Sequence, residues 1–118
     1  MDTTNEIKQE SFRDVEPRVD ILENEDEILL IADLPGVLKN DLDIQIKDER
    51  LSIVGKRQKQ EELLGKQDFW NVNYQRHFKL GKDVDVDKIE AELKNGTLTI
   101  HLPKSPEVKS RKIAIQSV

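Results

Sequence analysis

Short runs in which apolar and polar residues alternate follow one another through most of this chain, beginning at Val19. Alternation of this kind places apolar side chains on one face of a strand and polar side chains on the other. Short runs separated by turn-forming residues are typical of a β-sandwich or a β-barrel. We therefore predict an all-β fold of seven to eight antiparallel strands with flexible termini. The predicted runs are residues 19–22, 27–34, 42–47, 50–55, 68–72, 74–80, 88–93 and 97–102, followed by a fragment at 112–115.

Two segments between these runs carry the residues that sharp chain reversals require. Residues 33–41 contain a Pro-Gly pair, and residues 94–97 contain Asn95 and Gly96. Asn-Gly between two alternating runs is a strong signal for a β-hairpin, because both residues tolerate positive φ. The sequence therefore predicts a hairpin at this position.

One residue breaks the alternation of its run. In the run at residues 74–80, Arg76 falls on the same side as Tyr74, Phe78 and Leu80. An arginine on an apolar face needs a carboxylate partner or a place at the rim of the sheet. Arg76 is therefore either an amphipathic residue at the rim or a paired residue at a subunit interface.

The chain of 118 residues is predicted to hold one domain with two polar ends. Apolar and charged residues each make up 36%, so we expect a thin core and a heavily solvated surface. We assign residues 1–16 to a flexible N-terminal arm, residues 17–104 to the folded domain and residues 105–118 to a C-terminal extension. The polar segment at residues 56–68 is predicted to be a mobile loop.

The formal net charge of −5 is unevenly distributed along the chain. Residues 1–27 hold ten acids and three bases, whereas residues 104–112 hold four bases and one acid. The short basic segment is weak support for a nucleic-acid partner and the acidic part opposes one, so we predict none. No apolar run is long enough to span a bilayer, and the N-terminus lacks a signal-peptide pattern. We therefore expect a cytoplasmic protein.

Residues suited to catalysis or metal binding are scarce. The chain has no cysteine, and its serines lie outside any nucleophile-elbow motif. Residues 83–87 superficially resemble a calcium loop, but Lys88 and Lys94 occupy positions where that loop needs glycine and glutamate. His77 and His101 fall on polar strand faces and lack further ligands at metal-site spacing. With no phosphate-binding glycine motif, we predict no enzyme activity, no cofactor and no metal.

A set of four segments forms a recognisable combination of motifs. They are "ADLPGV" at residues 32–37, "YQRHFKL" at 74–80, "KIEAELKNGTLTIHLPK" at 88–104 and "KIAI" at 112–115. Together they resemble the small heat-shock proteins, the α-crystallin domain family. The most specific match is the family pattern A-x-x-x-N/D-G-V-L-x-[IV]-x-[IVL]-P-K, in which Thr97 replaces the usual valine.

The resemblance implies an immunoglobulin-like antiparallel β-sandwich that forms dimers and higher oligomers. It also implies an ATP-independent chaperone, or holdase, that binds partially unfolded client proteins and prevents their aggregation. ATP-dependent chaperones would then act downstream. The alternative is an adaptor of the related CS-domain fold, which binds an ATP-dependent chaperone directly. Such adaptors often have an acidic tail without an Ile-x-Ile motif, whereas this tail is basic and contains one.

The resemblance assigns a docking role to the tail. Ile113 and Ile115 match the motif that binds a groove on a neighbouring subunit, and alternation projects both side chains the same way. The groove lies between two edge strands that here resemble residues 42–47 and 88–93. The candidate wall residues, which would also bind clients, are Leu42, Ile44, Ile89, Ala91 and Leu93. The alternative is that the tail is a last edge strand folded onto its own domain.

The resemblance also points to a dimer interface. Arg76 matches an arginine that lies at this interface in the family, which favours the paired interpretation of that residue. Phe69 and Trp70 belong to the segment at residues 68–72, which some members exchange between dimer partners. We therefore predict that Arg76, Phe69 and Trp70 contribute to the dimer interface.

Overall fold

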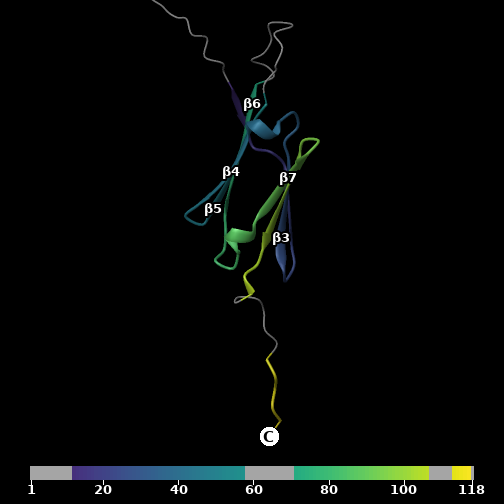
Figure 1. The fold of residues 1–118 in the computed structure, drawn as a ribbon, viewed down its shortest axis with the longest axis vertical. Helices are drawn as coiled ribbons and strands as arrows, with labels where there is room; N and C mark the ends of the chain where they lie inside the picture. Colours follow the sequence, from purple (N-terminus) through teal and green to yellow (C-terminus); the bar gives the residue numbers. More distant parts are fainter. Residues whose placement is uncertain (1–11, 58–70, 107–112, 118) are drawn as a thin grey trace, which may run out of the picture.

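The computed structural model describes residues 12–57, 71–106 and 113–117, in which eight strands form two four-stranded sheets (Figure 1). Sheet A has the strand order β1-β6-β5-β4, and sheet B has the order β2-β3-β8-β7. The predicted all-β sandwich is confirmed. The strands of sheet A are β1 (Arg13–Val15), β4 (Leu42–Lys47), β5 (Arg50–Arg57) and β6 (Val72–Lys79). The strands of sheet B are β2 (Val19–Glu23), β3 (Glu27–Asp33), β7 (Glu90–Lys94) and β8 (Thr97–Pro103).

The predicted runs correspond closely to the strands of the sandwich. The run at residues 42–47 is β4 residue for residue. The run at residues 88–93 becomes a strand only from Glu90, because Val86–Lys88 form a 3-10 turn in which the Asp85 side chain accepts a hydrogen bond from the Asp87 amide. A second 3-10 turn, Lys39–Asp41, precedes β4.

Two segments of the prediction fall largely outside the described residues. Most of the proposed loop at residues 56–68 is one of them, and residues 68–70 of the proposed strand at 68–72 are the other. Val72, the last residue of that proposed strand, is the first residue of β6.

Strand β1 differs from the prediction in position and direction. It lies within the range assigned to the N-terminal arm, and it pairs in parallel with β6, whereas every other strand pairing is antiparallel in the part of the chain that the structure describes. Parallel neighbours need a long connection, and almost sixty residues separate these two strands in the sequence. Three residues are too few to show an alternating pattern in the sequence, so this strand is identified only by its pairing with β6.

The core lies between the two sheets and follows the predicted alternation. In β8, the inward residues Leu98, Ile100 and Leu102 are fully buried, while His101 between them is exposed. In sheet A, Leu51 and Ile53 are equally buried. The full buried apolar set is Leu30, Ala32, Leu34, Val37, Leu51, Ile53, Val72, Tyr74, Leu80, Val84, Leu98, Ile100 and Leu102.

The predicted hairpin joins β7 to β8 through a two-residue turn. Asn95 has φ 50° and Gly96 has φ 77°, which are the positive values that such a turn requires. The Gly96 carbonyl accepts a hydrogen bond of 2.7 Å from the Leu34 amide, so the hairpin tip is attached to the end of β3. This turn therefore sets the register of β7, one of the two edge strands considered below.

We predict that Gly96→Ala lowers the free energy of unfolding by about 1 to 3 kcal/mol, because alanine is strained at positive φ. A Cβ there would also lie 3.2 Å from the Pro35 Cα and 3.3 Å from the Leu34 carbonyl oxygen. The measurement is urea unfolding followed by circular dichroism. Gly81→Ala is the matched control, because the one close contact of its Cβ would be with Asp83 Oδ1, at the end of a flexible side chain. Equal stability losses in both variants would contradict the prediction.

Candidate docking groove and dimer interface

An apolar groove opens between the edges of the two sheets. Strands β4 and β7 are the edge strands at this side of the sandwich, and their outer backbone has no strand partner in the described residues. The groove has a volume of about 420 Å³. Its lining residues are Lys39, Leu42, Ile44, Ala91, Glu92, Leu93 and Leu98. Unpaired strand edges beside apolar side chains suit the binding of an extended segment.

The structure brings together four of the five residues predicted for the groove wall. Leu42 and Ile44 lie on β4, and Ala91 and Leu93 lie on β7. Ile89 does not line this groove; it lies just before β7 and packs half-buried against the core. The reason is that β7 begins one residue later than Ile89, so this side chain belongs to the connection and not to the strand.

The groove has features that sequence reasoning did not assign. Lys39 and Glu92 place one positive and one negative charge on its lining, and buried Leu98 lies at its base. Three exposed apolar side chains lie on the segments that border it: Leu38 before β4, Ile46 within β4 and Val86 in the turn before β7. The alternation of its run predicted that Ile46 shares a face with Leu42 and Ile44, because the three residues are spaced two apart. Leu38 and Val86 lie outside the alternating runs, so the sequence pattern did not predict their position beside the groove.

The C-terminal residues 113–117 form no strand and lie exposed (Figure 1, yellow). Ile113 is 82% exposed and Ile115 is 94% exposed, which are the largest values among the exposed apolar residues of the described chain. Two isoleucines in this state have nearly their whole side-chain surface available for burial. The structure does not place this segment as an edge strand on its own domain.

Arg76 is turned inward, as its position in β6 predicted. Within the described residues, its Nη1 donates a hydrogen bond of 3.3 Å to the Pro17 carbonyl, and its Cζ lies 5.2 Å from the centre of the Phe78 ring. A carboxylate partner from a second subunit stays a prediction. The other two residues predicted for the dimer interface, Phe69 and Trp70, lie outside the described residues.

Asn71, which follows Trp70, is the one buried polar residue of the described core. Its side-chain nitrogen and oxygen have no hydrogen-bond partner among the described residues, although its backbone carbonyl accepts a bond of 3.1 Å from the Arg13 amide. A buried amide without partners costs about 1 to 3 kcal/mol, so this position favours contact with further polar groups.

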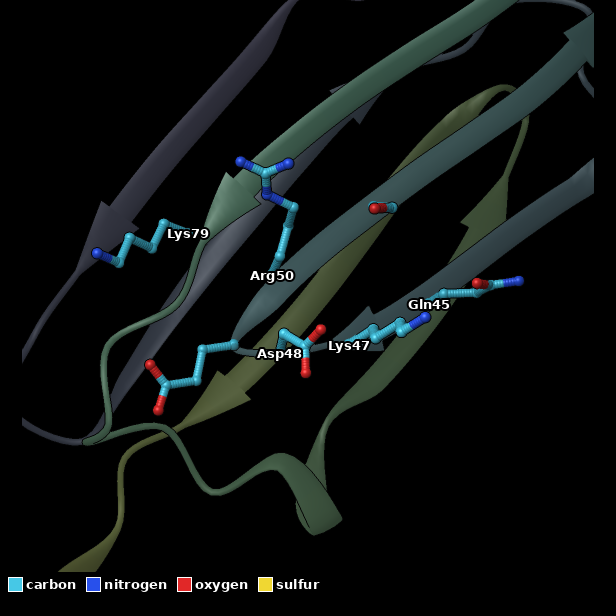
Figure 2. A pocket seen from close by; sticks show the side chains of 7 residues that line it. Gln45, Lys47, Asp48, Arg50 and Lys79 are labelled. Carbon is cyan, nitrogen blue, oxygen red and sulfur yellow. The ribbon is translucent and has the colours of Figure 1, made fainter.

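The outer face of sheet A carries a shallow basic depression around the turn between β4 and β5. Three cations, Lys47, Arg50 and Lys79, lie opposite one another in a single cross-strand row. Figure 2 shows their side chains directed away from one another and not toward one point, with Asp48 among them. Cations that do not converge, with acids beside them, do not form a defined site for a single anion.

The described residues contain no group of three potential metal ligands. No helix in the same part of the chain is long and apolar enough to cross a membrane. Ser52 Oγ lies 3.0 Å from His77 Nδ1, and the two residues are directly opposite each other on the outer face of sheet A. This is the position at which a cross-strand hydrogen bond stabilises a sheet.

Comparison with known proteins gives a consistent result. The model of the Hsp20/alpha crystallin family matches residues 20–116. The chain is 38% identical over 118 residues to the probable 15 kDa heat shock protein of Leptospira interrogans, covering 98% of this chain and 89% of that protein. It is 33% identical over 105 residues to spore protein SP21 of Stigmatella aurantiaca, covering 86% of this chain and 62% of that protein. A small heat-shock protein from Xylella fastidiosa, with a distinct high order structure, superimposes with a TM-score of 0.65 at 31% identity, covering 86% of this chain and 96% of that one.

Proposed function

This chain belongs to the Hsp20/α-crystallin family of small heat-shock chaperones, and from that premise we propose that it acts as an ATP-independent holdase. In this role it binds partially unfolded client proteins through apolar surfaces and keeps them from aggregating. The observation that carries the proposal is an open apolar groove on the same chain as an exposed Ile-x-Ile tail. The groove is suited to bind extended apolar segments, and the tail is a segment of that kind.

We propose that the tail of one subunit docks in the groove of another. Burying Ile113 and Ile115 stabilises the contact by about 3 to 6 kcal/mol. Ordering the tail costs about 1 to 2 kcal/mol for each residue, so a single tail binds weakly and reversibly. Many tails on one particle hold it together through their effective concentration. Tails that exchange in this way leave grooves transiently open for clients.

We further propose that the end of the sandwich around β1 and β6 forms the dimer interface. Arg76 and Phe78 form a partly buried cation–aromatic contact beside this edge. Asn71 lies at the same end of the sandwich, and its buried side-chain amide has no hydrogen-bond partner among the described residues. Phe69 and Trp70 are adjacent to Asn71 in the sequence and would supply apolar area to the same contact. A cytoplasmic location, and ATP-dependent chaperones acting downstream, remain predictions of the same proposal.

The test is light scattering from a heat-labile client protein during heating. We expect scattering to fall as the chaperone-to-client ratio rises toward equimolar, in the absence of ATP. A folded protein of similar mass at the same concentrations is the control for crowding. If equimolar chaperone left scattering unchanged at several temperatures, the holdase proposal would be wrong.

A pulldown from heated cells tests the alternative function. A holdase returns many aggregation-prone proteins in variable amounts. Recovery of one ATP-dependent chaperone in stoichiometric amount would instead support the CS-domain type of adaptor.

A further inference from the structure

The outward strand residues of the two sheets carry opposite net charge. The strand register shows which charged residues share each outward face. On sheet A these are four bases and two acids, namely Lys47, Arg50, Lys56 and Lys79 with Asp14 and Asp43. On sheet B they are five acids and one base, namely Asp20, Glu27, Asp33, Glu90 and Glu92 with Lys94.

The acidic side of the sandwich also has an apolar centre. Residues 28–32 of β3 form an unbroken apolar run, so β3 is apolar on both faces. Its inward residues pack in the core, whereas Leu29 and Ile31 point outward and are half-buried. Leu22 lies opposite Leu29 on β2 and is 57% exposed. Strands that are apolar on both faces are usually covered on both, which indicates that this side receives a partner.

We use the name acidic apolar face for Leu22, Leu29 and Ile31 together with Asp20, Glu27, Glu90 and Glu92. It is hollowed on both sides of His101, at the centre of the face. One hollow has a volume of about 300 Å³ and contains Leu22, Leu29 and Glu27 among its lining. The other has a volume of about 560 Å³ and is lined by Glu90, Ala91, Glu92 and His101. Apolar and acidic groups therefore line adjoining depressions.

Part of the negative charge on this face has no counter-charge in the part of the chain that the structure describes. Glu27 Oε1 lies 3.0 Å from His101 Nδ1, and the neighbouring Glu23 accepts a hydrogen bond of 2.7 Å from Lys104 Nζ. Glu90 and Glu92 have no ion-pair partner among residues 12–57, 71–106 and 113–117. Adjacent carboxylates without counter-charges attract cations and raise the on-rate of cationic partners.

We propose that the acidic apolar face binds cationic amphipathic segments of unfolding client proteins. Such a segment places apolar side chains over Leu22, Leu29 and Ile31 and directs lysine or arginine side chains to the surrounding carboxylates. This inference rests on the proposed holdase function and names a class of client for it. Among the described strands of sheet A, Val54 is the only apolar residue that points outward. A second copy that docked through this face would therefore leave Leu22 and Leu29 without an apolar contact.

The experiment compares two labelled peptides with the same leucines and isoleucines, one with lysines and the other with glutamates at the polar positions. Fluorescence anisotropy with the full chain measures their affinities at low and high salt. We expect tighter binding of the cationic peptide, and a loss of that preference at high salt because the charges are exposed and screened. Equal affinities for the two peptides at low salt would overturn the proposal.

The variant Asp20→Lys with Glu90→Lys reverses two exposed charges of the face that lie outside the tail groove. We expect it to weaken the cationic peptide about tenfold. The control variant, Asp43→Lys with Asp87→Lys, makes the same change in net charge away from the face and should retain the affinity. Leu22→Ser should weaken both peptides, because it removes apolar area and no charge. An equal loss in the charge-reversed variant and its control would show that only net charge acts.

Other occupants of the face give distinct results. If Ile113→Ala with Ile115→Ala strengthened peptide binding in the parent chain but not in the Asp20→Lys and Glu90→Lys variant, the chain's own tail would be the occupant of this face, and the assignment to clients would be wrong. A change in oligomer mass in the Asp20→Lys and Glu90→Lys variant, with unchanged peptide affinity, would assign the face to a second copy. If the chain showed no preference for the cationic peptide but still suppressed client aggregation, this inference would be wrong and the holdase proposal would be retained.

Discussion

Replacing both tail isoleucines by alanine, Ile113→Ala with Ile115→Ala, is expected to convert higher oligomers into dimers while the domain stays folded. Both side chains are more than four-fifths exposed, so their loss removes no contact within the domain. Their truncation removes about 4 kcal/mol of the favourable free energy of burial from each docked tail. That free energy is most of what offsets the conformational entropy lost when the tail becomes ordered. Native mass spectrometry measures the assembly, and circular dichroism verifies the fold.

The neighbouring residues of the tail provide a matched control. Gln116→Ala with Ser117→Ala also truncates two exposed side chains but removes little apolar area, so the oligomer mass should be retained.

Ala91→Glu tests the receptor side, because Ala91 is exposed and lines the groove. It should reproduce the dissociated state, and the combination with the tail variant should cause no further loss. An unchanged oligomer mass in the tail variant would mean that this motif does not link subunits.

The second large effect is expected from Leu98→Ala, which should lower the free energy of unfolding by about 2 to 5 kcal/mol. Leu98 is fully buried in β8, between Ala32 on β3 and Leu93 on β7 in the strand register. Its side chain fills the core below the groove, so its truncation leaves a cavity that neighbouring strands cannot close.

Leu93→Ala is the matched comparison, because the residue has the same chemistry but lies half-buried on the edge strand. We expect a loss of about 1 kcal/mol in stability, together with weaker tail docking. Stability should be compared in the Ile113→Ala and Ile115→Ala background, so that oligomerisation does not contribute to it. Tail docking should be compared in the parent chain, by oligomer mass. Urea unfolding gives the free energies. Equal losses for Leu98→Ala and Leu93→Ala would contradict the distinction between core and groove wall.

The strands and the main hairpin could be predicted because their signals are local. Inward and outward residues of β4 and β8 alternate in the sequence as they do in space. Asn95 and Gly96 accept positive φ for reasons intrinsic to the two residues. Strand β1 could not be predicted, because its three residues carry no periodicity and its pairing depends on β6, far along the chain.

The candidate site was predictable only in part. Four of the residues predicted from motif and alternation line the groove, whereas Ile89 lies just before β7, because a 3-10 turn delays the start of that strand. Arg76 was identified as the exception in its strand, yet its partners, the Pro17 carbonyl and the Phe78 ring, come from an interstrand segment and from its own strand. A sequence pattern shows that a charge needs a partner but does not identify it.

The sequence by itself determined the strands other than β1, their inward faces, the Asn-Gly turn and the Ile-x-Ile tail, because each depends on residues close together in the chain. The residue pattern alone did not decide which strands are edges; the family resemblance indicated β4 and β7, and the sheet order shows that both are edges that border one groove. Only the tertiary structure decided that carboxylates of β2, β3 and β7 gather around the outward leucines of β2 and β3 on one face of sheet B. Sheet order and register arise from pairing between distant segments, and local alternation contains no information about which segments become neighbours.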